Sequence, residues 1–272
     1  MRAWCNGSFV EPDSPAISVL DHGLTVGDGV FEAIKVVDNV PFALTRHLQR
    51  LQRSAVGLGL PEPDEPLVRK AVDEVLQAGD VALGRIRVTY TAGVSPLGSG
   101  RHTTAPTLVV VITESQPYPP TTKAVVVPWP RNERGALAGL KTTSYAENVV
   151  ALAYAGERGA SEAVFANTVG NLCEGTGTNV FCVFGDSVAT PPLSAGCLSG
   201  VTRNLVVEWC GVEERDISLA ELATADEVFL TSTTRDVQGV VQLDDRVFPA
   251  DQPVTAHVMQ VWREREPLDI DP

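Results

Sequence analysis

The segment GALAGLKTTSYAENVVALA, residues 135–153, places a lysine between small or apolar residues, immediately before a helix predicted from about Ser144 to Arg158. This lysine, Lys141, would be partly desolvated there, and desolvation lowers the pKa of an amine. A neutral amine is the form that attacks a carbonyl carbon and forms an imine. A lysine that extends its ammonium group into water fits the same pattern nearly as well, so the neighbourhood alone leaves both interpretations open.

The first third of the chain is predicted to form short strands and two amphipathic helices. Thr45 is a candidate N-cap for the first helix, in which Leu48 and Leu51 begin an apolar repeat of helical spacing. The second helix carries a similar repeat from Leu67 to Leu76. Strands are predicted at Ala3–Cys5, Gly29–Val37, Arg85–Ala92 and Thr107–Ile112.

A proline-rich stretch at Glu114–Thr122 continues neither a helix nor a central strand. We therefore predict a small N-terminal α/β domain over residues 1–116, an interdomain linker over 117–122 and a larger C-terminal domain over 123–272. In this last part, strands are predicted at Ala124–Pro128, Ala163–Ala166, Asn179–Val183, Glu227–Thr231 and Val237–Leu243, and helices at Gly200–Trp209 and Val254–Arg265. Because βαβ units do not alternate regularly, the pattern favours an α+β, or mixed α/β, fold over a Rossmann sheet.

The overall composition excludes several classes of protein. A formal net charge of −13 disfavours a nucleic-acid partner, which normally requires a basic surface. The five cysteines include no CxxC pair and the four histidines show no metal-ligand spacing, so we expect buried, reduced thiols and no metal site. No apolar run approaches the length of a membrane span, and we expect a cytoplasmic protein.

Two further patterns could serve a small anionic ligand. The stretch LCEGTGTNVF, residues 172–181, places Glu174 between an apolar strand and a glycine-rich turn, where a carboxylate could keep a heterocyclic nitrogen protonated. A solvated glutamate in a turn is the simpler alternative. Candidate phosphate sites are Arg46, the helix start Gly200-Val201-Thr202, and Ser232-Thr233-Thr234 at the end of a strand, although each alone is also explained by capping or surface charge.

Six motifs occur in an order that resembles the fold-type IV, or class IV, pyridoxal-phosphate enzymes: GDGVFEAIKV, TRHLQRLQRSA, LKTTSYAENVVALA, LCEGTGTNVF, CLSGVTRN and VFLTSTTRDV. The resemblance spans nearly the whole chain. It includes D-amino acid aminotransferases, branched-chain aminotransferases and aminodeoxychorismate lyases. It implies a two-domain fold with the cofactor pyridoxal 5′-phosphate at the domain interface, and a homodimer.

The resemblance also implies a role for individual residues. Lys141 would be the Schiff-base lysine and proton carrier, and Glu174 the partner of the pyridine nitrogen. Tyr145 lies one residue before the place at which branched-chain enzymes carry a tyrosine for the phenolic oxygen, so its role stays open. The remaining residues implied to bind the cofactor are Arg46, Leu198, Val201, Thr202, Ser232 and Thr233.

The substrate is less well defined by the resemblance. The motif EAIKV, residues 32–36, favours transamination of D-amino acids by a ping-pong mechanism, with branched-chain L-amino acids or primary amines as alternatives. Leu97 and Ser99 stand where D-amino acid enzymes carry an arginine and a histidine for the substrate carboxylate. The runner-up is 4-amino-4-deoxychorismate lyase, which yields 4-aminobenzoate and pyruvate, and a non-catalytic phosphate binder is a third interpretation. The candidates for orienting substrate or cofactor are Tyr145, Val26, Glu32, Lys35, Arg101 and His102.

Overall fold

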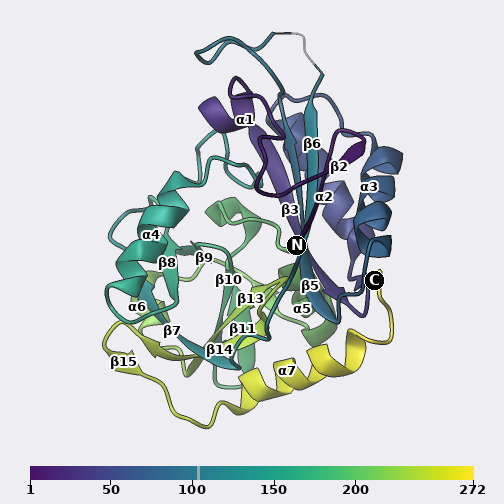
Figure 1. The fold of residues 1–272 in the computed structure, drawn as a ribbon. Coiled ribbons are helices and arrows are strands. Elements are labelled where there is room, and N and C mark those ends of the chain that lie inside the picture. The colour runs from purple at the N-terminus through teal and green to yellow at the C-terminus, as the bar shows by residue number, and fades with distance from the viewer. Residues whose placement is uncertain (103–104) are drawn as a thin grey trace. The chain divides into compact units, whose positions relative to one another are not determined.

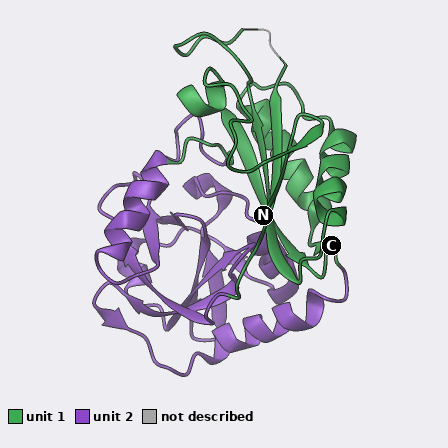
Figure 2. Ribbon diagram, in the orientation of Figure 1, with its two compact units in different colours: residues 1–117, 140–145, 270–272 green, residues 118–139, 146–269 purple. Residues whose placement is uncertain are grey.

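A computed structural model describes residues 1–102 and 105–272, which form two compact units (Figure 2). Unit 1 comprises Met1–Pro117, Leu140–Tyr145 and Ile270–Pro272, and unit 2 comprises Tyr118–Gly139 and Ala146–Asp269. Within the described residues, no helix combines the length and apolar character needed to cross a membrane.

Unit 1 is built on a six-stranded sheet of order β2-β1-β6-β5-β3-β4, in which every neighbouring pair is antiparallel (Figure 1). Its strands are β1 Arg2–Cys5, β2 Ser8–Val10, β3 Gly29–Val37, β4 Val40–Pro41, β5 Leu83–Thr91 and β6 Thr107–Glu114. Its helices are α1 His22–Thr25, α2 Leu44–Gly57 and α3 Glu65–Gln77. The predicted strand Gly29–Val37 therefore has the bounds of β3.

The two longer helices cover one face of this sheet. Val30, Ile34 and Val36 alternate along β3 and share a core with Leu48 and Leu51 of α2 and with apolar residues of α3. The residues between them, Phe31, Ala33 and Lys35, therefore project from the opposite face of β3, because side chains alternate along a strand.

The start of α2 differs from the prediction. Its N-cap is Ala43, and Thr45 lies inside the first turn. The side chain of Asp271 caps this turn instead, accepting from the Thr45 backbone N–H at 2.8 Å and from the Thr45 hydroxyl at 2.5 Å. Prediction of Thr45 as the cap was wrong because the capping carboxylate comes from the far end of the chain.

Unit 2 contains a nine-stranded mixed sheet of order β12-β11-β10-β13-β14-β7-β8-β9, with β15 paired to β14. Its strands are β7 Thr121–Val126, β8 Glu162–Ala166, β9 Leu172–Gly175, β10 Asn179–Phe184, β11 Ser187–Thr190, β12 Glu213–Glu214, β13 Glu227–Ser232, β14 Asp236–Leu243 and β15 Arg246–Val247. Its helices are α4 Ala146–Gly156, η1 Leu193–Ala195, α5 Val201–Cys210, α6 Leu219–Leu222 and α7 Pro253–Arg265.

Both faces of this second sheet are buried. Ala124 and Val164 belong to one apolar cluster, whereas their neighbours Val125 and Phe165 belong to another that includes residues of α4. Alternation between two clusters along adjacent parallel strands is typical of a sheet covered on both sides. The core explains why these strands are rich in apolar residues at consecutive positions.

The units differ from the predicted division at one place that matters for the site. Residues 140–145 lie in the predicted C-terminal range, 123–272, but are grouped with unit 1. The physical reason is backbone pairing, because Thr142 forms a β-bridge with Val30 of β3. Lys141 is therefore carried by unit 1.

Candidate functional site

The segment that carries Lys141 is fixed at both ends by unit 1. The Lys141 backbone N–H donates to the Ser54 hydroxyl of α2 at 3.1 Å, and its carbonyl accepts from the Phe31 N–H at 3.0 Å. Two residues later, the Thr143 N–H donates to the Gly29 carbonyl at 2.8 Å. The backbone of Lys141 is thus held in place by α2 and β3.

The amine of Lys141 lies among aromatic and cationic side chains. Its Nζ is 4.4 Å from the centre of the Phe31 ring, and the Tyr145 ring meets Phe31 edge-on with centroids 5.4 Å apart. The guanidinium carbon of Arg87 lies 3.9 Å from the centre of the same Phe31 ring. Lys141, Tyr145 and Arg87 therefore gather around one phenylalanine.

Arg87 was not identified from the sequence. Burial of part of its side chain lowers the pKa of the guanidinium, and the charge of Arg85 adds to that effect. The strand β5 pairs Thr89 with Phe31 and Arg87 with Ala33, so Arg87 projects from the face of the sheet that carries Phe31. The alternation of side chains along β3 and β5 is the signal that could have identified Arg87. The same alternation places Lys35 on this face.

Beneath β3, a buried carboxylate is held by two side chains of α2. Glu32 accepts from Arg50 at 2.8 Å and 2.6 Å and lies 2.7 Å from Nδ1 of His47. Desolvation opposes ionisation of Glu32, but the charge and hydrogen bonds of Arg50 and the bond to His47 outweigh it and lower the pKa of Glu32 to about 2. Desolvation likewise lowers the pKa of His47, with the charge of Lys141 contributing in the same direction.

The predicted phosphate arginine, Arg46, lies in the first turn of α2. Its Nε donates to the carbonyl oxygen of Pro272 at 2.6 Å. Arg50, one turn further along α2, is buried on the same side of the helix as Ser54, which holds the Lys141 backbone. Arg50 is thus a second cation that sequence patterns did not single out.

In unit 2, Glu174 is held by a backbone amide and an arginine. Its Oε2 accepts from the Leu198 N–H at 2.8 Å, and its Oε1 lies 3.7 Å from Nε of Arg131. Arg131 is itself fixed by bonds to Glu147 and Asn148 and stands over the Phe165 ring at 4.1 Å. The positive charge of Arg131 favours the ionised form of a carboxylate at this place.

Other predicted residues of unit 2 lie close to this acid along a chain of contacts. Asn179 donates to the Leu198 carbonyl at 2.8 Å and pairs across the sheet with Thr231, the residue before Ser232. A Cβ added to Gly200 would strike the Asn179 side chain, so the start of α5 also meets this asparagine. Glu174, Leu198, the Gly200–Thr202 turn and the end of β13 are therefore neighbours within unit 2.

The start of α5 suits a phosphate group. Its N-cap is Gly200, so the first turn has no capping side chain among the described residues. Backbone N–H groups in a first turn carry partial positive charge and bind anions. The hydroxyls of Thr202, Ser232 and Thr233 add donors of the kind that phosphate oxygens accept.

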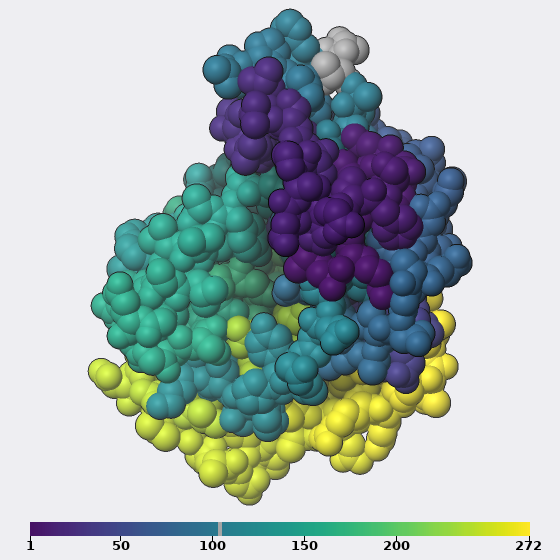
Figure 3. All heavy atoms as spheres, viewed as in Figure 1, coloured from purple at the N-terminus to yellow at the C-terminus, as the bar shows by residue number. Residues whose placement is uncertain are grey.

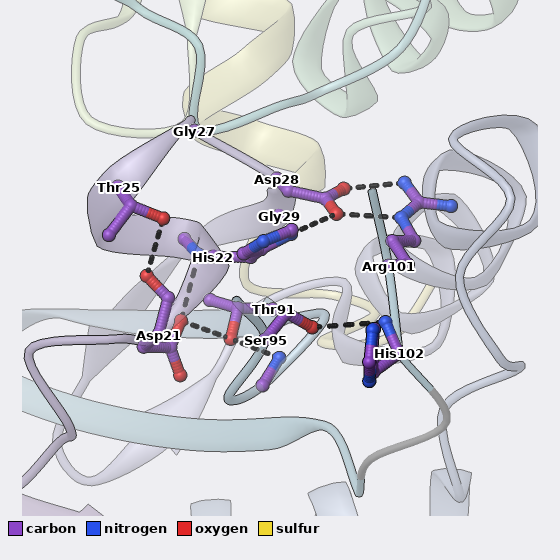
Figure 4. A network of polar contacts seen from close by, with 12 residues as sticks. Asp21, His22, Thr25, Gly27, Asp28, Gly29, Thr91, Ser95, Arg101 and His102 are labelled. Carbon is purple, nitrogen blue, oxygen red and sulfur yellow. Dashed lines mark hydrogen bonds and ion pairs between the residues drawn. The ribbon is translucent and has the colours of Figure 1, made fainter. Parts of the chain in front are cut away.

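In the loop between β5 and β6, Arg101 faces the carboxylate of Asp28 (Figure 4). Its guanidinium donates to both carboxylate oxygens of Asp28, at 2.6 Å and 2.5 Å, and to the carbonyls of Leu58 and Gly59 at 2.8 Å. His102 donates its backbone N–H to the Ser95 hydroxyl at 3.3 Å. Val26 ends α1 and is exposed.

The cysteines are unpaired and play no part in this geometry. All five are free, and four of them are buried. Burial raises the pKa of Cys182 and of Cys197 to about 12, which keeps both thiols protonated near neutral pH.

Comparison with known proteins identifies relatives over most of the chain. A sequence profile described as Amino-transferase class IV matches residues 29–243. The chain is 35% identical to a putative branched-chain-amino-acid aminotransferase of Methanocaldococcus jannaschii, covering 91% of this chain and 89% of the relative. Identity is 27% to the aminodeoxychorismate lyase of Bacillus subtilis, over 97% and 94% of the two chains. It is 29% to the D-alanine aminotransferase of Staphylococcus haemolyticus, over 89% of each.

Solved structures show the same similarity in three dimensions. A branched-chain aminotransferase of Thermoproteus uzoniensis, described with norvaline, has a TM-score of 0.90 at 30% identity, covering 97% of this chain and 94% of that one. A fold IV transaminase of Curtobacterium pusillum has a TM-score of 0.84 at 32% identity, over 93% and 92%. A hypothetical aminotransferase of Mycobacterium tuberculosis in a PLP-bound form has a TM-score of 0.86 at 27% identity, over 97% and 98%.

Proposed function

Because the chain belongs to the class IV aminotransferase family, with the fold-type IV architecture expected from its sequence, we propose that it catalyses pyridoxal-phosphate-dependent transamination between an amino acid and a 2-keto acid. The observation that carries this proposal is the position of Lys141. Its amine lies against the ring of Phe31, which Tyr145 and Arg87 also contact. An amine for the reaction and a cation for a carboxylate thus occur together in unit 1.

When bound, pyridoxal phosphate supplies an aldehyde that condenses with amines and a ring that withdraws electrons from the attached carbon. Lys141 would hold the cofactor through its amine, and its Nζ would carry the proton that the reaction moves. Glu174 would accept a hydrogen bond from the protonated ring nitrogen, and Arg131 favours the charged form that this role requires.

The residues of unit 2 fit the phosphate of this cofactor. Val201 and Thr202 would donate backbone N–H groups from the first turn of α5, and Ser232 and Thr233 would donate hydroxyls. Leu198 would pack against the ring. Arg46 remains the arginine proposed from the motif, and we add Arg50, because it is the buried arginine on the side of α2 that holds Lys141. A guanidinium has five N–H donors, so each arginine could donate to a phosphate besides the partner that it already has, Glu32 for Arg50 and Pro272 for Arg46.

The position of Arg87 supports a carboxylate-bearing substrate over a simple primary amine. The amine and the carboxylate of an α-amino acid are attached to the same carbon, so a cation near the catalytic amine can fix the carboxylate. We do not assign this purpose to Arg101, because four of its N–H groups already donate to Asp28, Leu58 and Gly59. The remaining candidates for orienting substrate or cofactor are Lys35, Glu32, Val26 and Tyr145.

The class of amino acid has support from two sides. The EAIKV motif and the relatives named D-alanine aminotransferase, at 29% identity, favour D-amino acids. The higher identity, 35%, to a relative named as a putative branched-chain enzyme favours branched-chain L-amino acids. The EAIKV motif therefore favours D-amino acids, whereas the higher sequence identity favours branched-chain L-amino acids, and we give the sequence identity more weight.

Aminodeoxychorismate lyase remains the second candidate, and the observation in its favour is the Bacillus subtilis relative, which matches 97% of this chain. The lyase would use the same Lys141 to eliminate pyruvate and release 4-aminobenzoate. A spectrophotometric half-reaction screen separates the two reactions. Transamination predicts that the cofactor absorbance changes with one enantiomer of leucine, valine or alanine and returns with 2-oxoglutarate or pyruvate. The lyase would instead release 4-aminobenzoate from 4-amino-4-deoxychorismate and would show no such change of absorbance with the amino acids.

We further propose that the enzyme acts in the cytoplasm as a homodimer. Five free cysteines suit a reducing compartment. Helix α4 exposes Val149, Val150 and Leu152 on one side, an apolar surface that a second copy would cover. Sedimentation analysis of the holoenzyme tests the dimer.

A further inference from the structure

Arg101 joins two elements that both hold the Lys141 segment. Figure 4 shows its guanidinium facing the carboxylate of Asp28, in the turn Gly27–Gly29. The same guanidinium donates to the carbonyls of Leu58 and Gly59, at the C-terminal end of α2. These carbonyls belong to the C-cap residue of α2 and to the residue after it, where the helix dipole favours a cation. One side chain therefore connects the turn to the helix.

Both connected elements contact the segment around Lys141. On the α2 side, Ser54 accepts the Lys141 N–H, and the side chain of Leu140 packs against Gly57 so closely that an added Cβ would lie 2.7 Å from it. On the turn side, the Thr143 hydroxyl donates to the Gly27 carbonyl at 2.9 Å, and the Ser144 hydroxyl donates to the same carbonyl at 3.1 Å. Residues 140–144 are thus bonded to α2 at their start and to the turn at their end.

Further bonds keep the Arg101 loop itself in place. The buried carboxylate of Asp21 accepts from Thr91 at 2.8 Å and from Thr107 at 2.7 Å, the two residues that flank the loop. His22 lies 3.0 Å from the Pro96 carbonyl through Nε2 and 3.4 Å from Asp28 through Nδ1. In Figure 3 the purple atoms around α1 and the blue-teal atoms of this loop lie next to one another at the surface.

We propose that Arg101 is a positioning residue, a clamp that fixes the Gly27–Gly29 turn to the end of α2 and thereby holds Lys141 in its place. This inference rests on the proposed function only for its catalytic consequence, since the clamp itself is a property of unit 1. The charge of Arg101 also keeps Asp28 ionised. Burial opposes this ionisation, but the hydrogen bonds and charge of Arg101 outweigh burial, and the pKa of Asp28 lies below its usual value.

The first test measures amide hydrogen exchange in cofactor-free protein. Arg101→Ala is expected to increase exchange at Phe31, Lys141 and Thr143 by about tenfold, because local opening then breaks fewer bonds. Arg101→Lys retains the charge but not the fork, and should show a smaller increase. The matched control is Arg215→Ala in unit 2, since Arg215 is 30% exposed, as against 35% for Arg101, and also pairs with a carboxylate.

The second test measures the kinetics of the holoenzyme. A displaced lysine transfers protons more slowly, so Arg101→Ala should lower kcat by about tenfold or more and leave KM within about twofold. Asp28→Asn should lower kcat to a similar extent. The double variant should have a kcat no lower than that of Arg101→Ala alone, because the two substitutions remove the same clamp. If Arg101 instead bound the substrate carboxylate, KM would rise and kcat would be retained, and the proposal would be wrong.

The two tests separate failure of the clamp from failure of the proposed function. Unchanged exchange in Arg101→Ala, or a change equal to that of Arg215→Ala, overturns the clamp. Faster exchange with unchanged kcat overturns its role in positioning Lys141. If the wild-type protein neither transaminates nor forms a Schiff base, the proposed function fails, and the exchange measurement still decides the clamp. Should Arg101→Ala not fold, Arg101→Lys and Asp28→Asn give the same comparison.

Discussion

Glu174 shows how a single residue acquires a role from its neighbours. The sequence pattern is compatible with a partner for a heterocyclic nitrogen and with a solvated glutamate in a turn, and the resemblance favours the first. The structure adds Arg131 and the Leu198 amide, which fix the carboxylate at defined atoms. Arg131 lies 43 positions from Glu174 in the sequence, so no local pattern could have identified this pairing.

Glu174→Gln tests the charge at this position. The amide keeps a similar shape but no longer stabilises a protonated ring nitrogen, so we expect kcat to fall by about 100-fold or more while the cofactor still binds. The control is Glu147→Gln, because Glu147 also bonds Arg131 but its side chain is half exposed. Equal activity of Glu174→Gln and the control would contradict the assigned role.

Arg87 is the residue whose role the sequence patterns missed. It lies in a strand rich in alternating polar residues, where a surface charge is the ordinary interpretation, and only the pairing of β5 with β3 brings it to Phe31. Arg87→Ala should raise KM for the amino acid by about 10- to 100-fold with a smaller change in kcat. Steady-state kinetics compares the KM of Arg87→Ala with that of the control Arg85→Ala, which removes the other arginine on the same face of β5. A substrate-independent loss of kcat would argue against carboxylate binding.

At the scale of elements, sequence periodicity predicted β3 and the existence of α2, because both bury one apolar face. It could not predict how α2 begins. Its first turn is capped by Asp271, which lies 226 positions beyond Thr45. Capping rules assume a local side chain, and a cap supplied by a distant segment lies outside them.

Asp271→Ala is therefore expected to destabilise unit 1. Removal of a capping carboxylate from a helix N-terminus costs about 1 kcal/mol, the magnitude typical of such caps. Urea unfolding should show a lower midpoint for this variant. The control is Asp13→Ala, which changes net charge equally at an exposed position of the same unit. Identical midpoints would show that the contact does not contribute.

The buried pair between β3 and α2 predicts a pH dependence of stability. The pKa of Glu32 is lowered from 4.5 to about 2 in the folded state, so its contribution is present above pH 4.5 and is lost as the pH falls towards 2. A shift of this size corresponds to about 3 kcal/mol. Glu32→Gln should lower the free energy of unfolding at pH 7 by a comparable amount and flatten its decline below pH 4.5.

Thermal or urea unfolding between pH 2 and pH 6 checks this expectation. The control is Glu65→Gln, which removes an exposed i,i+4 pair with Arg69 and should cost less than about 1 kcal/mol. If Glu32→Gln retained the pH dependence of the wild type, another acidic group would be responsible for it.

At the scale of the whole molecule, the sequence predicted the mixed α/β class correctly, and the comparisons confirm the family. The last two residues of the predicted linker, Thr121 and Thr122, belong to β7, the first strand of unit 2. What periodicity could not predict is that residues 140–145 and 270–272 return to unit 1. Such returns depend on long-range backbone pairing, here between Thr142 and Val30, and leave no signal in local composition.

The central claim is that Lys141 forms the Schiff base with pyridoxal phosphate. This claim can be tested directly because the chain contains few lysines. The chain contains four lysines, Lys35, Lys70, Lys123 and Lys141. Borohydride reduction of the protein loaded with pyridoxal phosphate, followed by peptide mass spectrometry, locates the lysine that forms the Schiff base. We predict loss of the visible absorbance band and a reduced cofactor attached to Lys141. A cofactor found on Lys35, Lys70 or Lys123, or on no lysine, would contradict the account.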